Sequence, residues 1–125
     1  MSESTGRVDR VSGITYVHIP ARDPVASAAF YRAVFDWEIR GNPQHPSFSD
    51  GTGDVIGAWV TDVPVAGDAG IVPYVYVANV DETLEKVTGQ GGLIAKAPYP
   101  EGDLRVATFR DPAGNVIGVW QFESH

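Results

Sequence analysis

The chain has 125 residues, a formal net charge of −7 and no cysteine. This length fits one domain with a modest core. The missing cysteine excludes disulfides, thiolate metal ligands and a cysteine nucleophile, and it suits a cytoplasmic protein. Because nine Lys and Arg residues are scattered along an acidic chain, and phosphate backbones require a basic patch, nucleic acid is not an expected partner. The acidic balance favours a neutral or cationic small molecule.

Residues 1–12 are predicted to form a flexible N-terminal tail. They begin with the polar segment MSESTGRVDR, which lacks the apolar stretch of a secretory signal. Apolar runs elsewhere in the chain are short and broken by Gly, Pro or Asp. None approaches the roughly 20 residues that a membrane span requires, so a membrane is not an expected partner.

Residues 13–62 are predicted to form a first module of one strand, one helix and three more strands. The β-branched run at 14–19 predicts the first strand. Asp23 is a good N-cap and Pro24 fits the first helical position, so a helix is expected from there to Phe35. The remaining expected elements are a strand at 37–40, a loop at 41–46, and a hairpin of 47–50 and 55–60 closed by Gly51 and Gly53.

Residues 63–72 are rich in Gly, Pro and Ala and are interpreted as a linker to a second module at 73–122. Asp81 is expected to cap a helix that reaches about Gln90, where two glycines end it. The other expected elements are strands at 73–80, 93–97, 104–110 and 116–121, with turns at 99–103 and 111–115. The second module therefore repeats the order of the first.

The two halves also match in sequence. Residues 16–19 (YVHI) align with 74–77 (YVYV), and residues 55–59 (VIGAW) align with 116–120 (VIGVW). A three-residue insertion in one loop accommodates both matches. We interpret this as an internal duplication, with chance similarity between β-rich segments as the alternative.

Strand alternation divides the matched strands into two faces. One face is aliphatic and suits packing beneath a helix; it carries Val17, Ile19, Ile56, Ala58, Val60, Val75, Val77, Ile117 and Val119. The other face is aromatic and polar; it carries Tyr16, His18, Val55, Gly57, Trp59, Tyr74, Tyr76, Val116, Gly118 and Trp120. Because two glycines leave space among aromatic side chains with polar tips, we expect this second face to line a ligand cavity. A dimer interface is the competing interpretation.

Three segments resemble the vicinal-oxygen-chelate superfamily, which includes glyoxalase I, extradiol dioxygenases and bleomycin-resistance proteins. They are YVHIPARDPVASAAFYRAVFDWEI, VANVDETLEKVTGQGG and RDPAGNVIGVWQ, and the resemblance runs from about Thr15 to Gln121. The resemblance implies an α+β fold of two βαβββ modules that form a curved mixed sheet around a cavity. It also implies a homodimer and a place among small glyoxalase-like proteins.

In metal-dependent members of that superfamily, the ligands come from the first and last strands of each module. Carried over by position, these slots are His18, Gly57, Tyr76 and Gly118. Only His18 is a good ligand, and a catalytic metal site needs about three protein ligands. The resemblance therefore implies the fold without its usual metal, and no cofactor is expected.

Two functions follow from these observations. The first is a bleomycin-resistance-like protein that binds a small aromatic or cationic molecule without chemistry of its own. The second is an enzyme of lyase, isomerase or dioxygenase type, which uses His18 as a base or in an unusual metal site. The expected ligand-binding residues are Tyr16, His18, Trp59, Tyr74, Tyr76 and Trp120.

The cavity interpretation predicts an order of stabilities. If Trp59 and Trp120 line an open pocket, replacing either with Ala removes contacts on one side only. Scaled for the area lost, both changes are then expected to be milder in thermal melts than Val75→Ala on the helix-covered face. His45 and His125 are expected to be solvated.

Overall fold

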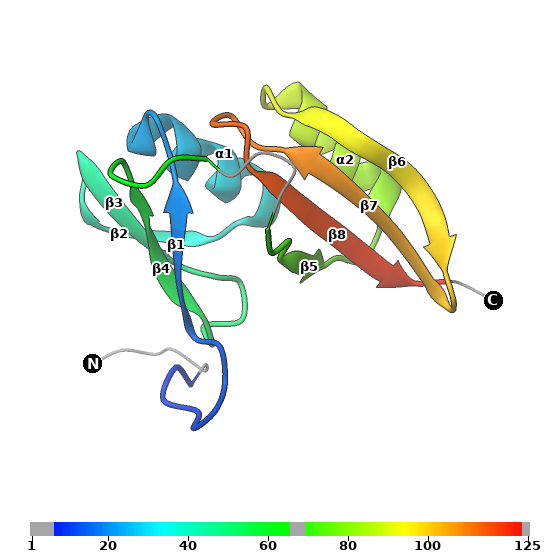
Figure 1. The fold of residues 1–125 in the computed structure, drawn as a ribbon, viewed down its shortest axis with the longest axis horizontal. Coiled ribbons are helices and arrows are strands. Elements are labelled where there is room, and N and C mark those ends of the chain that lie inside the picture. Colours follow the sequence, from blue (N-terminus) through cyan, green and yellow to red (C-terminus); the bar gives the residue numbers. More distant parts are fainter. Residues whose placement is uncertain (1–6, 66–69, 124–125) are drawn as a thin grey trace. The chain divides into compact units, whose positions relative to one another are not determined.

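The computed structural model describes residues 7–65 and 70–123. Residues 1–6 of the predicted tail, residues 66–69 of the predicted linker and His125 lie outside the described residues. The chain divides into two compact units, Met1–Pro64 and Val65–His125. Each unit has a four-stranded mixed sheet and one helix (Figure 1). The expected α+β class and the repeated order of strand, helix and three strands are confirmed.

The first unit has its strands in the order β1-β4-β3-β2, with β1 parallel to β4 and the other pairs antiparallel. Its elements are β1 (Tyr16–Pro20), α1 (Pro24–Phe35), β2 (Glu38–Asn42), β3 (His45–Ser49) and β4 (Ile56–Val60). The helix packs on one face of this sheet, chiefly against β3. The other face carries no helix of this unit (Figure 1).

Helix α1 begins and ends at the residues that its sequence predicts. The Asp23 carboxylate accepts hydrogen bonds from the backbone N–H groups of Val25 and Ala26, and Pro24 occupies the first turn. Asp36 ends the helix in the left-handed region, with φ 61°. The face that the helix buries consists of Ser27, Ala28, Phe30, Tyr31 and Val34.

The second unit has the same topology, with strands in the order β5-β8-β7-β6. Its elements are β5 (Tyr74–Tyr76), α2 (Val80–Gly89), β6 (Leu93–Glu101), β7 (Leu104–Arg110) and β8 (Val116–Phe122). Fully buried aliphatic and aromatic side chains lie between α2 and the sheet: Val80, Val87, Ala107, Phe109 and Val119. No helix in the described part of the chain is long and apolar enough to span a membrane.

Four local predictions were wrong. The expected strand at 73–80 is much shorter, because β5 spans only Tyr74–Tyr76 and helix α2 already begins at Val80. The expected loop at 41–46 belongs instead to the β2–β3 hairpin. Pro43 lies in its two-residue connection, where the Asn42 side chain accepts from the Gln44 N–H, whereas Gly41 and Pro46 pair with each other in the strands. The expected turn at 99–103 is mostly strand. Pro98 and Pro100 are tolerated in this strand because β6 is an edge strand with register shifts in its pairing with β7.

The N-cap of the second helix is the fourth difference. Asn79, rather than Asp81, caps α2, and its side-chain oxygen accepts from the Glu82 N–H at 2.9 Å. Asp81 lies in the first turn and pairs with Arg105 on β7 at 3.0 Å. Both residue types are good caps, so the sequence pattern alone did not separate them.

Candidate functional site

The open face of the second sheet gathers the aromatic residues that the sequence placed together. Tyr74 lies opposite Gly118, and Tyr76 lies opposite Trp120, in the parallel pairing of β5 with β8. Residues paired across a ladder point to the same side of a sheet. The shared face of these four residues is therefore confirmed, while their contact with a ligand stays a prediction.

The aromatic rings on this face form a connected group with Phe122. The ring centroids of Tyr76 and Trp120 are 4.8 Å apart, and those of Trp120 and Phe122 are 5.1 Å apart. Tyr74, Tyr76 and Phe122 are 42%, 58% and 61% exposed. An exposed group of several aromatic side chains is characteristic of a binding surface.

A hollow of about 270 Å³ opens on the same face. Its lining comes from four strands of the second unit: Tyr74, Glu101, Leu104, Val106 and Trp120. Val106 and Trp120 are paired across β7 and β8, so the floor of the hollow is apolar. Glu101 provides the only formal charge in this lining.

The phenol of Tyr74 is held in its neutral form. Burial raises its pKa above the ordinary value of 10.0, and the neighbouring Tyr99, which also hydrogen-bonds to it, and the Glu101 carboxylate raise it further. The Lys96 ammonium lies 4.1 Å from the centre of the Tyr99 ring. The hollow therefore offers a phenol, a carboxylate and aromatic rings to a molecule that enters it.

The glycines do not leave the space that the sequence interpretation gave them. A Cβ atom on Gly118 would collide with the ring of Tyr74, and one on Gly57 would collide with the ring of Phe48 and the carbonyl of Val17. In each unit, an aromatic neighbour thus occupies the room that the glycine provides. The argument that both glycines hollow out one cavity was wrong.

Trp59 also lies on the opposite side from the predicted one. In the β1–β4 ladder, Ile19 lies opposite Trp59 and His18 lies opposite Ala58, so Trp59 shares the face of Ile19. The indole is 4% exposed and packs 4.8 Å from the ring of Phe48. Trp59 belongs to the core beneath α1.

The cause of this error is a one-residue shift between the two units. Tyr16 and Tyr74 are equivalent, yet Tyr16 pairs with Ile56 whereas Tyr74 pairs with Gly118. The register of the VIGAW segment against β1 therefore differs by one residue from the register of the VIGVW segment against β5. A shift of one residue moves every side chain of a strand to the other face.

Tyr16 and His18 do share the open face of the first sheet. The His18 Nε2 atom is 3.1 Å from the Tyr16 hydroxyl oxygen, and the two rings meet edge to face at 5.0 Å. Their ladder partners on β4 are Ile56 and Ala58. This face thus offers an imidazole and a phenol beside small aliphatic side chains.

The divalent metal typical of the superfamily does not fit these residues. Beside His18 on the first sheet, the side chains are Tyr16, Ile56 and Ala58; beside Tyr76 on the second sheet, they include Trp120. Aliphatic and indole side chains are not ligands for a hard or borderline cation. Among the described residues, no group of three or more His, Cys, Asp or Glu side chains is placed to hold a metal ion.

Several residues in and beside the hollow were not foreseen. Glu101 and Tyr99 were assigned to a turn, whereas they extend β6 along the open face. Leu104 and Val106 lie two residues apart on β7 and therefore face the same side of the sheet, and this spacing of apolar residues is the signal that the sequence contained. Phe122 lies one residue beyond the predicted end of the last strand.

The profile of the Glyoxalase/Bleomycin resistance protein/Dioxygenase superfamily matches residues 13–119. The chain belongs to this family. Two mycobacterial relatives, each named "Putative glyoxylase CFP32" and found in Mycobacterium bovis and Mycobacterium tuberculosis, are 28% identical over 120 residues. The match covers 88% of this chain and 46% of those proteins. This chain therefore spans about half the length of these curated relatives.

Solved structures of other family members share the fold. The fosfomycin resistance protein FosX from Listeria monocytogenes superposes with a TM-score of 0.74 at 16% identity, over 90% of this chain and 94% of FosX. TnmS3, an antibiotic binding protein from Streptomyces sp. CB03234, gives 0.70 at 21% identity, over 90% and 97% of the two chains. A family enzyme from Burkholderia phytofirmans gives 0.72 at 23% identity, over 86% and 97%.

Proposed function

We propose that this family member binds a small planar molecule against the open face of its second sheet, without a metal. The observation that carries the proposal is the connected group of Tyr76, Trp120 and Phe122 beside the hollow lined by Tyr74 and Glu101. Small-molecule sites combine apolar and aromatic walls with a few placed polar groups. This face has that composition.

The charge of the site favours a ligand with a cationic group. Glu101 is the one charged residue that lines the hollow, and it lies beside the neutral phenol of Tyr74. A carboxylate next to aromatic rings attracts an ammonium or aromatic cation, because the negative faces of the rings and the carboxylate act together. The net charge of −7 adds to this attraction at longer range.

The structural neighbour TnmS3 supports binding as the function class, whereas the mycobacterial relatives, each named "Putative glyoxylase CFP32", favour an enzyme. TnmS3 is an antibiotic binding protein, and FosX is a fosfomycin resistance protein. These likenesses are below 25% identity, so they extend to this chain only as part of the proposal. We propose that its ligand is an antibiotic-like or other planar small molecule.

A pair of probes of equal shape tests the site. N-methylacridinium is a planar cation, and acridine is its neutral counterpart at pH 8. Isothermal titration should show tighter binding of the cation. Trp120→Ala should weaken both probes about tenfold, the equivalent of about 1.4 kcal/mol, because stacking is lost.

Two further variants complete this experiment. Glu101→Gln should weaken only the cation, since it removes the charge and keeps the shape. Leu93→Ala is the matched control, because Leu93 is an exposed apolar residue of the same unit outside the hollow. Unchanged affinities in Trp120→Ala, or equal losses in Trp120→Ala and Leu93→Ala, would overturn the proposal.

A second candidate function is enzymatic, and the pairing of His18 with Tyr16 favours it. The 3.1 Å contact between Nε2 and the phenol oxygen holds the imidazole in one orientation on an open face. An oriented imidazole is the commonest general base in enzymes. Under this candidate, His18 abstracts a proton in a metal-free lyase or isomerase reaction.

Turnover separates the two functions. Compounds that bind are incubated with the protein and followed by mass spectrometry, and His18→Gln should abolish conversion without changing affinity. If the unmodified protein converts none of these compounds, the enzymatic candidate is wrong and binding is the function that remains.

A further inference from the structure

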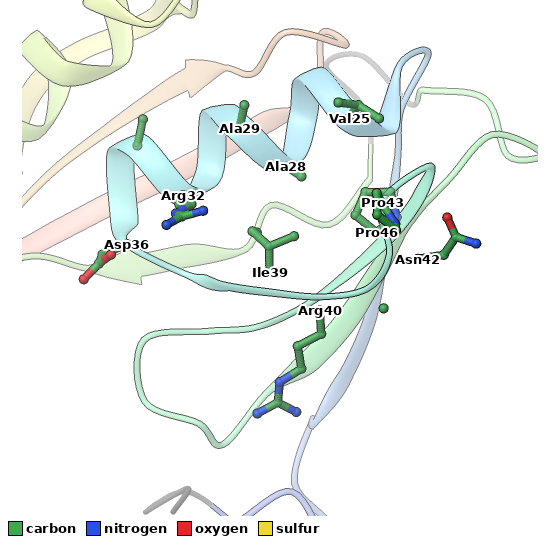
Figure 2. Close-up of a pocket in the computed structure, with 12 residues that line it drawn as sticks. Val25, Ala28, Ala29, Arg32, Asp36, Ile39, Arg40, Asn42, Pro43 and Pro46 are labelled. Carbon is green, nitrogen blue, oxygen red and sulfur yellow. The ribbon is translucent and has the colours of Figure 1, made fainter. Parts of the chain in front are cut away.

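Strand β2 forms an edge of the first sheet and borders a groove beneath α1. The groove has a volume of about 680 Å³ and lies between the helix and β2. Its lining is mainly small and apolar, with Val25, Ala28, Ile39 and Pro46, and it also includes the charged residues Arg32 and Asp36. Figure 2 shows Ile39 pointing toward α1, whereas Arg40 points to the other side of the strand. The outer edge of β2 thus has an apolar side and a charged side.

The β2 edge lacks three of the features that block pairing with another strand, although it carries the charged side chains of Glu38 and Arg40. Natural edge strands are protected by prolines, lysines and bulges. The equivalent edge strand β6 has all three, with Pro98, Pro100, Lys96 and two register shifts. In contrast, β2 contains no proline or lysine, and its pairing with β3 is regular from Glu38 to Asn42.

The charges along β2 are complementary to themselves. Glu38 and Arg40 flank Ile39 and form an ion pair at 3.1 Å, with side chains that are 65% and 41% exposed. When two β2 strands run antiparallel with Ile39 opposite Ile39, each Glu38 lies opposite the Arg40 of the other copy. Opposite charges in directly opposed positions stabilise a ladder, and like charges destabilise it.

We propose that two copies of this chain associate through antiparallel pairing of their β2 strands, with Ile39 on the twofold axis. The resulting interface is isologous, since each copy contributes the same patch. The backbone groups of the edge gain partners, and the exposed apolar residues of the groove, including Val25 at 52% exposure, become covered. The family resemblance implies a dimer without indicating a surface; β2 provides one.

The helices leave room for this arrangement. Helix α1 packs chiefly against β3, one strand in from the edge. In the paired sheet, the two β3 strands are three spacings apart, or about 14 Å. Helices in contact pack at about 8–10 Å, so the α1 helices of the two copies do not clash, and side chains fill the space between them.

Charge reversal tests the pairing. Light scattering of the unmodified chain should give a mass of about 27 kDa, twice the 13.4 kDa of one copy. Glu38→Arg and Arg40→Glu each place two like-charge pairs at the axis, and each should raise the dimer dissociation constant at least about tenfold. The double variant Glu38→Arg/Arg40→Glu should restore the dimer.

A mixture of the two single variants gives the sharpest result. Glu38→Arg in one copy and Arg40→Glu in the other restore opposite charges across the axis, so native mass spectrometry should show mainly heterodimers. Glu85→Arg makes the same change in net charge as Glu38→Arg at an exposed position on α2, and this variant should dimerise like the unmodified chain. Circular dichroism checks that each variant folds.

Two results would overturn the proposal. One is a monomer at micromolar concentrations. The other is a dimer that both single variants leave unchanged, because that dimer would use another surface.

Discussion

The indole of Trp59 lies among aromatic rings on the α1 side of the first sheet. Tyr31, Trp37 and Phe48 stack or tilt against one another in this cluster, with neighbouring centroids 4.7–4.8 Å apart. The Nε1 atom of Trp59 has no hydrogen-bond partner among the described residues. Trp59 therefore contributes packing and no polar contact that the structure shows.

This placement reverses the expected effect of replacing Trp59. Trp59→Ala should lower the free energy of unfolding by about 3–5 kcal/mol, because it empties a packed site. Trp59→Phe should cost much less, since no hydrogen bond is lost. Trp120 is half-exposed, so Trp120→Ala should cost about 1–2 kcal/mol. Urea unfolding of the three variants measures this order, and a larger loss for Trp120→Ala would contradict it.

Tyr74 makes stability depend on pH in the alkaline range. Burial, Tyr99 and Glu101 raise its pKa in the folded chain, so the folded chain holds this proton to higher pH than the unfolded chain does. The contribution to stability is present below the unfolded value of 10.0 and is lost as pH rises through the folded pKa. Urea unfolding between about pH 9 and pH 11 should show a smaller fall in stability for Tyr74→Phe. Identical pH profiles would refute this role.

At the scale of elements, the two matched glycines have different neighbours. The space next to Gly57 is filled by the buried ring of Phe48 and a backbone carbonyl, neither of which moves easily. The space next to Gly118 is filled by the ring of Tyr74, which is partly exposed. The same added methyl group therefore meets a rigid environment in one unit and a movable one in the other.

We expect Gly57→Ala to cost about 3 kcal/mol or more, and Gly118→Ala about 1 kcal/mol. Gly118→Ala should also weaken acridine binding, because the displaced Tyr74 ring lines the hollow. Thermal melts measure the first difference and titration measures the second. Equal destabilisation by both changes would show that the two glycines have equivalent surroundings after all.

At the scale of the whole molecule, the two units repeat one topology with different open faces. The first face offers His18 and Tyr16, and the second offers Tyr74, Tyr76 and Trp120. Neither set contains three donors that suit a divalent cation. The two units thus share one topology but present different residues on their open faces.

We expect the purified protein to contain far less than one Zn, Mn, Fe or Ni ion per chain after dialysis. The reason is that small aliphatic and aromatic residues surround His18 and Tyr76 where a metal site needs carboxylates or imidazoles. Elemental analysis by mass spectrometry checks this expectation. About one metal ion per chain, retained through dialysis and lost in His18→Ala, would refute it.

The sequence by itself determined the class of fold and the repeated order of elements. Capping residues located α1, and β-branched runs located most strands, because these signals act within a few residues of the chain. The same local rules placed Tyr74 and Tyr76 on one face of their strand. They also brought Tyr16 and His18 together, since alternation within one strand is independent of its partners.

Only the tertiary structure decided what lies across the strands. Alternation fixes the faces of each strand, but the register between strands decides which faces coincide, and a shift of one residue in β4 moved Trp59 from the open face to the core. The extension of β6 to Glu101 likewise depended on pairing with β7, which overrode the turn propensity of Pro100. Strand pairing is a contact between distant segments, and for that reason no local pattern in the chain determined it.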